Sequence, residues 1–162
     1  MSEQLLRQHR TYLCQTAVAR PLGDAIDLEL PLEFTAFCVL HQPCYLRYSE
    51  ARLGSTPAAK QAVAAALGDL AMSWSSALAS LSPARAAWSL LTDRVDNAPV
   101  APSADATAAL YRILPAFQAD LVVLHHQLRV PLTLVSRTVG RPHGDVAGLL
   151  SLAERNMPLS TS

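Results

Sequence analysis

The sequence predicts an all-α fold, because its apolar residues recur at helical spacing and its helix starts are marked by capping residues. Apolar residues return every three or four positions along most of the chain, so each segment has one face to bury. Thr56-Pro57 and Ser82-Pro83 each combine a capping hydroxyl with a proline, which favours the first turn of a helix. Of the 162 residues 51% are hydrophobic and 16% are charged, so the chain can bury a core.

These signals divide the chain into four segments. Residues 1–30 form an N-terminal extension with an amphipathic helix, and residues 31–95 form a three-helix bundle. Residues 96–105 form a proline- and alanine-rich linker, and residues 106–162 form a second helical domain. The apolar stripes expected to be buried in the bundle are Phe34, Phe37, Cys38, His41, Tyr45 and Tyr48, then Val63, Leu67, Leu70 and Trp74, then Trp88, Leu91 and Val95.

The second domain contains a helix-turn-helix pattern. A helix that opens at Leu114 ends at Arg129-Val130-Pro131, because proline cannot donate to a continuing helix. Residues 132–139 then form a short helix, Gly140-Arg141-Pro142 turns the chain, and residues 143–156 form a third helix. The residues of this third helix expected to face inward are Val146, Leu150, Ala153 and Met157.

Residues 144–154, in this third helix, read Gly-Asp-Val-Ala-Gly-Leu-Leu-Ser-Leu-Ala-Glu. They resemble the recognition helix in region four of bacterial extracytoplasmic-function (ECF) sigma factors, which usually reads Gly-Thr-Val-Lys/Arg-Ser-Arg-Leu-x-Arg-Ala-Arg. Residues 45–54 and 59–63 read Tyr-Leu-x-Tyr-x-x-x-Arg-Leu-Gly and Ala-x-x-Ala-Val. They resemble region two of that family, which binds core RNA polymerase and melts the promoter. The resemblance implies a region-two-like three-helix bundle and a region-four-like helix-turn-helix domain.

The outward residues of the third helix depart from this family. Leu149 and Leu152 stand where arginine is usual, Gly148 lies in mid-helix, and Asp145 would repel DNA phosphate. Such a face suits a protein better than base edges, so these four residues are a candidate protein-binding face for a partner or for the chain's own N-terminal helix. The candidate DNA-contacting residues are Arg137, Arg141, His143 and Arg155.

The surface that would face the polymerase also departs from the pattern of the family, in a way that would weaken the contact. Members of the family carry acidic residues after the Leu-Gly turn, and these acids meet a basic stretch of the polymerase. Here the candidate polymerase-facing residues are Lys60, Gln61, Ala64 and Ala65. A lysine in place of an acid changes attraction into repulsion. The alternative interpretation is that this surface drifted because contacts elsewhere suffice.

The charge balance disfavours a protein whose main task is to grip nucleic acid. The 13 basic residues match 13 acidic ones, so the formal net charge is zero. In 114–157 the four arginines exceed Asp120, Asp145 and Glu154 by one, giving a net of +1. No signal peptide and no long apolar span is visible, so the predicted location is the cytoplasm and no membrane contact is expected.

No catalytic, metal or cofactor site is predicted. The sequence lacks a glycine-rich phosphate loop, a Gly-x-Ser-x-Gly turn and a His-Glu-x-x-His motif. In Cys38-x-x-His41-x-x-Cys44, residue 44 swings away from the helix face that 38 and 41 share, so buried thiols are favoured over zinc. His125 and His126 point about 100° apart on a helix and cannot chelate together.

These observations favour a sigma-factor-like transcription regulator that acts mainly through protein–protein contacts, with weakened core-polymerase and promoter contacts. Its expected partner is a regulatory protein or an RNA polymerase subunit, and promoter DNA is expected to be a weak partner. The alternative is a functional, divergent ECF sigma factor that directs RNA polymerase to promoter DNA. A third hypothesis, a helical enzyme or ligand-binding protein, lacks a site in the sequence.

Overall fold

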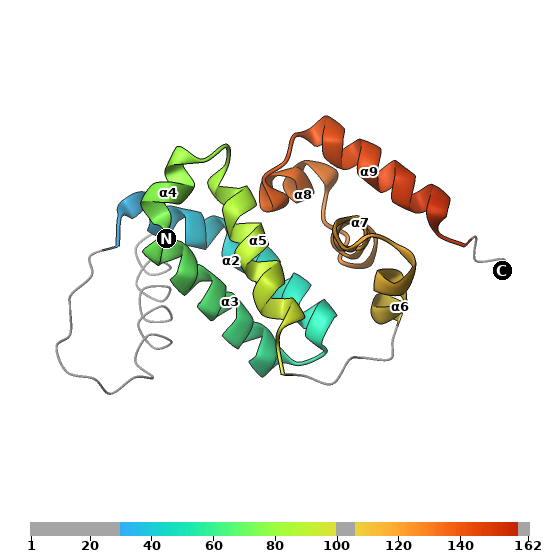
Figure 1. The fold of residues 1–162 in the computed structure, drawn as a ribbon, viewed down its shortest axis with the longest axis horizontal. Helices are drawn as coiled ribbons and strands as arrows, with labels where there is room; N and C mark the ends of the chain where they lie inside the picture. The colour runs from blue at the N-terminus through green and yellow to red at the C-terminus, as the bar shows by residue number, and fades with distance from the viewer. Residues whose placement is uncertain (1–29, 100–105, 159–162) are drawn as a thin grey trace, which may run out of the picture. The chain divides into compact units, whose positions relative to one another are not determined.

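The computed structural model describes residues 30–99 and 106–158 of the chain. Within these ranges it contains eight α-helices, one π-helical segment and no strand, which confirms the predicted all-α class (Figure 1). The elements are α2 (Leu32–Leu53), α3 (Thr56–Met72), α4 (Trp74–Ala79), α5 (Pro83–Asp96), α6 (Ala106–Ile113), α7 (Ala116–Val122), η1 (Val123–Gln127), α8 (Leu132–Val139) and α9 (His143–Asn156). The helix predicted near the N-terminus lies outside the described residues.

The chain divides into two compact units, residues 1–40 and residues 41–162, and α2 crosses from the first to the second. In the described part of the first unit, Phe34 and Cys38 are buried. The description below concerns the second unit. The predicted division into domains at 95 and 106 stays a prediction. Among the described helices, none combines the length and the apolarity needed to cross a bilayer.

Helix starts follow the predicted chemistry with one correction. Ser82 caps α5, since its Oγ accepts a hydrogen bond from the Arg85 backbone nitrogen at 3.3 Å. The cap of α3 is Ser55, not Thr56, and its Oγ accepts from the Ala58 nitrogen at 3.3 Å. A cap at Thr56 would need the Ala59 backbone N–H as its donor. That N–H already donates to the Ser55 carbonyl oxygen at 2.9 Å.

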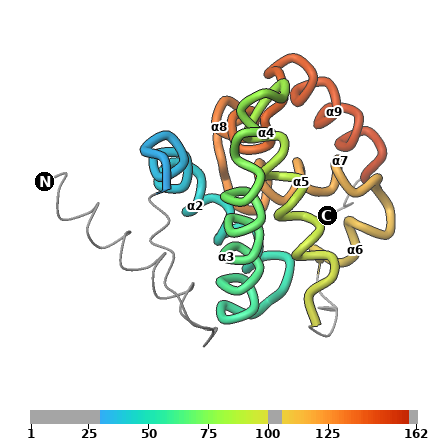
Figure 2. The backbone as a smooth tube through the Cα atoms, turned by 60° about the vertical axis from the view of Figure 1, so that its left-hand side comes forward, coloured from blue at the N-terminus to red at the C-terminus, as the bar shows by residue number. Residues whose placement is uncertain are grey.

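The helices α3 and α5 pack side by side (Figure 2). Of the stripe predicted on α2, Phe37 is only half-buried. Every stripe residue of 63–95 that was expected inside is buried, including both tryptophans. The Trp88 ring packs on Tyr48 with a centroid separation of 4.6 Å. The left-handed backbone of Gly54, with φ of +62°, ends α2 as predicted.

The two helices on either side of Gly140, α8 and α9, have the predicted bounds. The chain leaves α8 through Gly140, whose φ of +67° is the left-handed conformation that glycine accepts without a Cβ penalty. The Arg141 nitrogen donates to the Ser136 carbonyl oxygen at 3.1 Å, which satisfies one of the free carbonyls at this helix end. On α9, Val146, Leu150 and Ala153 are buried as predicted, and Met157 is half-buried.

The helix predicted from Leu114 differs in detail from a regular α-helix. It begins at Ala116 and changes at Val123 to a π-helical segment, η1, which ends at Gln127. The wider turn has a hydrogen-bond reason: the Leu128 nitrogen donates to the Val123 carbonyl oxygen at 2.9 Å, five residues back. Arg129 then takes a left-handed conformation with φ of +57°, and the helix stops before Pro131 as expected.

Candidate functional site

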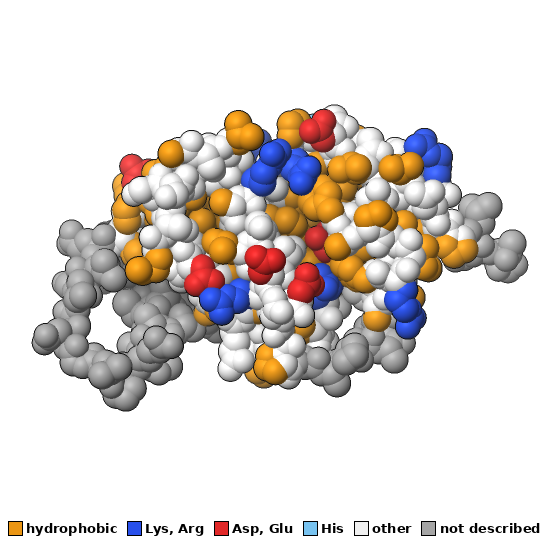
Figure 3. All heavy atoms as spheres, viewed as in Figure 1, with side chains coloured by type: hydrophobic (Ala, Val, Ile, Leu, Met, Phe, Trp, Pro, Cys, Tyr) orange, Lys and Arg blue, Asp and Glu red, His pale blue; other side chains and the backbone are white. Residues whose placement is uncertain are grey.

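The candidate protein-binding face lies on successive turns of α9. Asp145 and Gly148 are exposed, and Leu152 is 37% exposed, whereas Leu149 is half-buried and therefore less outward than predicted. A Cβ added at Gly148 would meet no atom within 4 Å among the described residues, so this part of the helix is open. In Figure 3, the surface over α6–α9 carries many hydrophobic side chains and few lysine or arginine side chains. The face is thus accessible and weakly charged.

The four candidate DNA-contacting residues do not form one cluster. Arg137, His143 and Arg155 are exposed, and they come from α8, the start of α9 and the last turn of α9. At a rise of 1.5 Å per residue, His143 and Arg155 are separated by roughly 18 Å along the helix axis. Arg141 is half-buried, with its guanidinium carbon 4.4 Å from the centroid of the Phe117 ring. This cation–π contact already occupies one face of the guanidinium.

The candidate polymerase-facing residues lie on one side of α3. Lys60 and Gln61 are exposed, and Ala64 and Ala65, one turn further on, are half-buried. Ala62 and Val63, which lie between them in the sequence, are buried and face the core. The surface therefore presents one cation and no carboxylate at the four positions.

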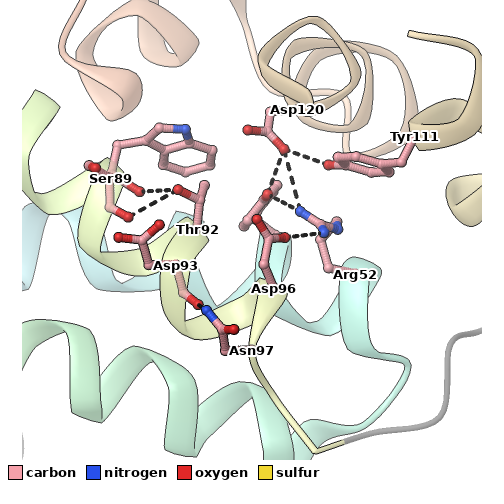
Figure 4. A network of polar contacts seen from close by, with 10 residues as sticks. Arg52, Ser89, Thr92, Asp93, Asp96, Asn97, Tyr111 and Asp120 are labelled. Carbon is pink, nitrogen blue, oxygen red and sulfur yellow. Dashed lines mark hydrogen bonds and ion pairs between the residues drawn. The ribbon is translucent and has the colours of Figure 1, made fainter. Parts of the chain in front are cut away.

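The structure brings together a polar cluster that the sequence reading did not identify. We call it the Asp120 cluster, and it consists of Tyr48, Arg52, Asp96, Tyr111 and Asp120. Figure 4 labels four of the five, all except Tyr48. Asp120 Oδ1 accepts hydrogen bonds from the hydroxyls of Tyr48 at 2.6 Å and Tyr111 at 2.5 Å. Arg52 Nη1 donates to the Tyr48 hydroxyl at 2.6 Å and lies 3.5 Å from Asp120 Oδ1. Arg52 Nη2 pairs with Asp96 Oδ1 at 2.6 Å, so one guanidinium faces two carboxylates.

Burial controls the electrostatics of this cluster. The Asp120 side chain is only 6% exposed, and burial raises the pKa of its carboxyl to about 6, although the two tyrosine hydroxyls and Arg52 act in the opposite direction. The negative charge of Asp96 raises it further. Burial, together with the Asp120 charge, also raises the pKa of both tyrosine hydroxyls, so they remain donors. The cluster is a buried carboxylate held by donors, not an arrangement of free acid and base groups.

Two further arginines from residues 41–96 contact residues 106–157. Arg47 Nη2 donates to the Leu128 carbonyl oxygen, at the end of η1. Arg85 Nε donates to the Gly140 carbonyl oxygen at 3.4 Å. Gly140 approaches the start of α5 so closely that an added Cβ would overlap the Arg85 backbone nitrogen and would lie 2.7 Å from Ser82 Oγ. The turn between α8 and α9 is therefore packed on the first turn of α5.

Among the described residues, Cys38 and Cys44 are buried, and His125 and His126 have hydrogen-bond partners. Burial raises the pKa of the Cys38 thiol to about 12 and also raises that of Cys44. His125 Nδ1 donates to the Val130 carbonyl oxygen at 2.9 Å, and His126 Nε2 lies 2.8 Å from Glu154 Oε1. In the described part of the chain, no three His, Cys, Asp or Glu side chains are placed to hold a metal ion.

One sequence signal could have revealed the Asp120 cluster. Asp120 falls three residues after Phe117 and directly before Leu121, within the apolar stripe predicted for that helix. A carboxylate in such a stripe must find buried partners. Tyr48 and Arg52, four residues apart on one helix face, supply them. Which helix would supply the partners could not be read from the spacing.

Comparison of the chain with known protein families, with curated proteins and with solved structures finds no match.

Proposed function

We propose that the chain is a sigma-factor-like transcription regulator that acts mainly through protein–protein contacts, with weakened contacts to core polymerase and promoter DNA. The observation that carries the proposal is the outer face of α9, where Gly148 and Leu152 are exposed and neither position offers a cation. A reader of base edges needs hydrogen-bonding side chains there, above all arginine. An accessible apolar and acidic face instead suits a protein partner.

The use of arginine in the structure supports the same proposal. Arg52 and Arg85 are engaged by groups of the chain itself, and Arg141 stacks on an aromatic ring. The N–H groups that Arg52 and Arg85 donate to internal acceptors are not available to a phosphate. On α3, the exposed Lys60 lies where members of the resembled family present acids to the polymerase. Contacts to promoter DNA and contacts to core polymerase are therefore both expected to be weak.

In such a regulator, each of the four segments of the chain has a role. Residues 31–95 are a region-two-like bundle, residues 106–162 are a region-four-like helix-turn-helix domain, and residues 96–105 are the linker between them. Residues 1–30 are an extension that can cover a functional face. The regulator works in the cytoplasm, where its partner is a regulatory protein or a polymerase subunit, and it carries out no catalysis.

The second candidate function is that of a working, divergent ECF sigma factor. The exposure of Arg137, His143 and Arg155 favours it, since all three side chains are free to approach phosphate. Their separation along α8 and α9 limits the number of phosphates that they can reach together.

The two functions predict different salt dependence of DNA binding. With three exposed candidate groups, the slope of log K against log salt should be no steeper than about −3, and no duplex should bind more tightly than about 1 μM at physiological salt. Fluorescence anisotropy with random and promoter duplexes, between low and moderate salt, measures both quantities. A functional sigma factor that makes six or more phosphate contacts would give a slope of about −5 or steeper.

A gain-of-contact variant is the matched control for this titration. Leu149→Arg with Leu152→Arg restores arginine at the two family positions, so the slope should steepen by about 2. If the wild-type chain instead binds one duplex at nanomolar concentration and discriminates against random sequence, the second candidate function is the correct one.

A further inference from the structure

A second stripe of residues runs along α9 beside the stripe that faces the core. Its members recur at steps of three and four residues, so they lie on one side of the helix. They are Asp145, Gly148, Leu149 and Leu152. At 1.5 Å per residue the stripe covers about 10 Å of the helix axis, or about two turns. A ridge with this spacing is one on which a second helix can pack.

The middle of the stripe allows a close approach. Gly148 has no side chain, and a Cβ added there would meet no atom within 4 Å among the described residues. Leu149 and Leu152 adjoin this gap, the first half-buried and the second exposed. The distance between two packed helices depends on the side chains at their contact, so the glycine admits a protruding apolar side chain and the leucines supply its apolar contacts.

Charges of opposite sign lie at the two ends of α9. Asp145 is in the first turn and Arg155 is in the last turn, and both are exposed. Arg155 follows Leu152 by three residues and so shares its side of the helix. Neither charge belongs to an ion pair of the described residues, whereas Glu154, on another side of α9, lies 2.8 Å from His126. Asp145 and Arg155 are therefore available to the charges of a partner.

The chemistry of α9 disfavours the other common modes of peptide recognition. An added strand needs the free edge of a sheet, and the described residues contain no strand. A polyproline segment needs a groove lined by aromatic rings, and α9 has no phenylalanine, tyrosine or tryptophan. A phosphorylated motif needs clustered arginines, and α9 has one arginine. The packing of an amphipathic helix is the mode that suits this stripe.

We propose that the α9 stripe binds an amphipathic helix of a partner protein, and that this helix lies antiparallel to α9. The partner helix rests on the proposed function, in which the outer face of α9 binds a protein. The helix dipole favours acidic residues in the first turn of any helix and basic residues in the last turn. An antiparallel partner helix with such charges places its basic end beside Asp145 and its acidic end beside Arg155. A parallel one brings like charges together at both ends.

Selection from a display library of randomised peptides tests the class of ligand, with the full chain as bait. The peptides have about 20 residues, because helices shorter than about 12–15 residues are marginal in water. Peptides that also bind Leu149→Glu plus Leu152→Lys, a variant that must keep the wild-type helix signal, are removed. We expect the remaining peptides to have apolar residues at steps of three and four, acidic residues in the first turn and basic residues in the last.

An exchange of charges tests the orientation. A selected peptide is titrated by fluorescence anisotropy against the wild-type chain and against Asp145→Lys with Arg155→Glu. Its binding to the variant should be weaker by about tenfold, since two attractive contacts become repulsive. A second peptide, with its terminal acids and bases exchanged, should recover the affinity for the variant. The matched control is Asp93→Lys with Arg112→Glu, which exchanges charges at exposed positions of α5 and α6 and should leave binding unchanged.

The possible failures separate this inference from the proposed function. Peptides that depend on the leucines but lack helical spacing, or that carry their charges in the parallel order, overturn the antiparallel helix and leave the protein-binding face in place. The absence of any peptide that depends on the leucines overturns both. Displacement of the selected peptide by a synthetic peptide of residues 1–20 would assign the face to the chain's own N-terminal segment, and the partner helix would be wrong.

Discussion

Replacing Gly140 with alanine is expected to lower the free energy of unfolding by about 2–5 kcal/mol. Two costs combine at this position. A non-glycine residue pays about 1–2 kcal/mol for the left-handed backbone, and the new Cβ overlaps the Arg85 backbone nitrogen, which a flexible side chain cannot relieve. Either α5 or the turn after α8 must move. Urea denaturation followed by circular dichroism measures the loss.

Two other glycines separate these costs. Gly54 has φ of +62° but open space around its Cβ position, so Gly54→Ala should cost only the backbone term of about 1–2 kcal/mol. Gly148 lies inside α9 with no neighbour within 4 Å, so Gly148→Ala should stabilise the chain by up to about 1 kcal/mol. The contact between α5 and the helix-turn-helix would be refuted by a Gly140→Ala variant that is no less stable than Gly54→Ala.

Asp120 is expected to make the chain more stable as the pH falls from about 6 to about 4. Its pKa is raised to about 6 in the folded chain, mainly by burial, and is about 3.9 in an unfolded one. The folded chain therefore binds the proton more readily in this window, and folding gains up to about 3 kcal/mol as the carboxyl is protonated. This contribution is lost again as the pH rises through about 6.

The Asp120→Asn variant should lack this component. The difference in free energy of unfolding between wild type and Asp120→Asn is the quantity to follow, by urea titrations from pH 4 to pH 7.5. On acidification the free energy of unfolding of wild type should rise relative to that of Asp120→Asn by up to about 3 kcal/mol. Asp93→Asn removes an exposed carboxylate from α5 and serves as the control, with no comparable shift expected. A difference that stays constant with pH, or that changes in the opposite direction, contradicts the assigned burial of Asp120.

Much of the fold could be predicted because helix signals are local. Proline and glycine determined where α8 begins and ends, and capping serines determined the starts of α3 and α5 to within one residue. The all-α class followed from the same periodicity. The change from α7 to η1 could not be predicted, because it depends on which carbonyls the residues after Val123 can reach. That choice is made by tertiary structure rather than by spacing.

The candidate site was less predictable, because it depends on contacts between distant helices. The outward direction of Asp145 and Gly148 followed from helical periodicity, but the half-burial of Leu149 did not. The stacking of Arg141 on Phe117 joins residues that are 24 positions apart, and the link from Tyr48 to Asp120 joins residues 72 apart. A single sequence shows that Asp120 needs partners, but only the arrangement of α2, α5 and α6 supplies them.

Capture from native cell extract tests the central claim most directly, which is that the outer face of α9 binds a protein. The tagged wild-type chain is compared with Leu149→Glu plus Leu152→Lys, and with Ser75→Glu plus Ser76→Lys, which places the same charges at exposed positions of α4. All three chains must first give the same helix signal. We predict a protein, either a regulatory protein or a polymerase subunit, that wild type and the α4 variant retain and the α9 variant loses. Polymerase subunits captured equally by all three chains would contradict the account.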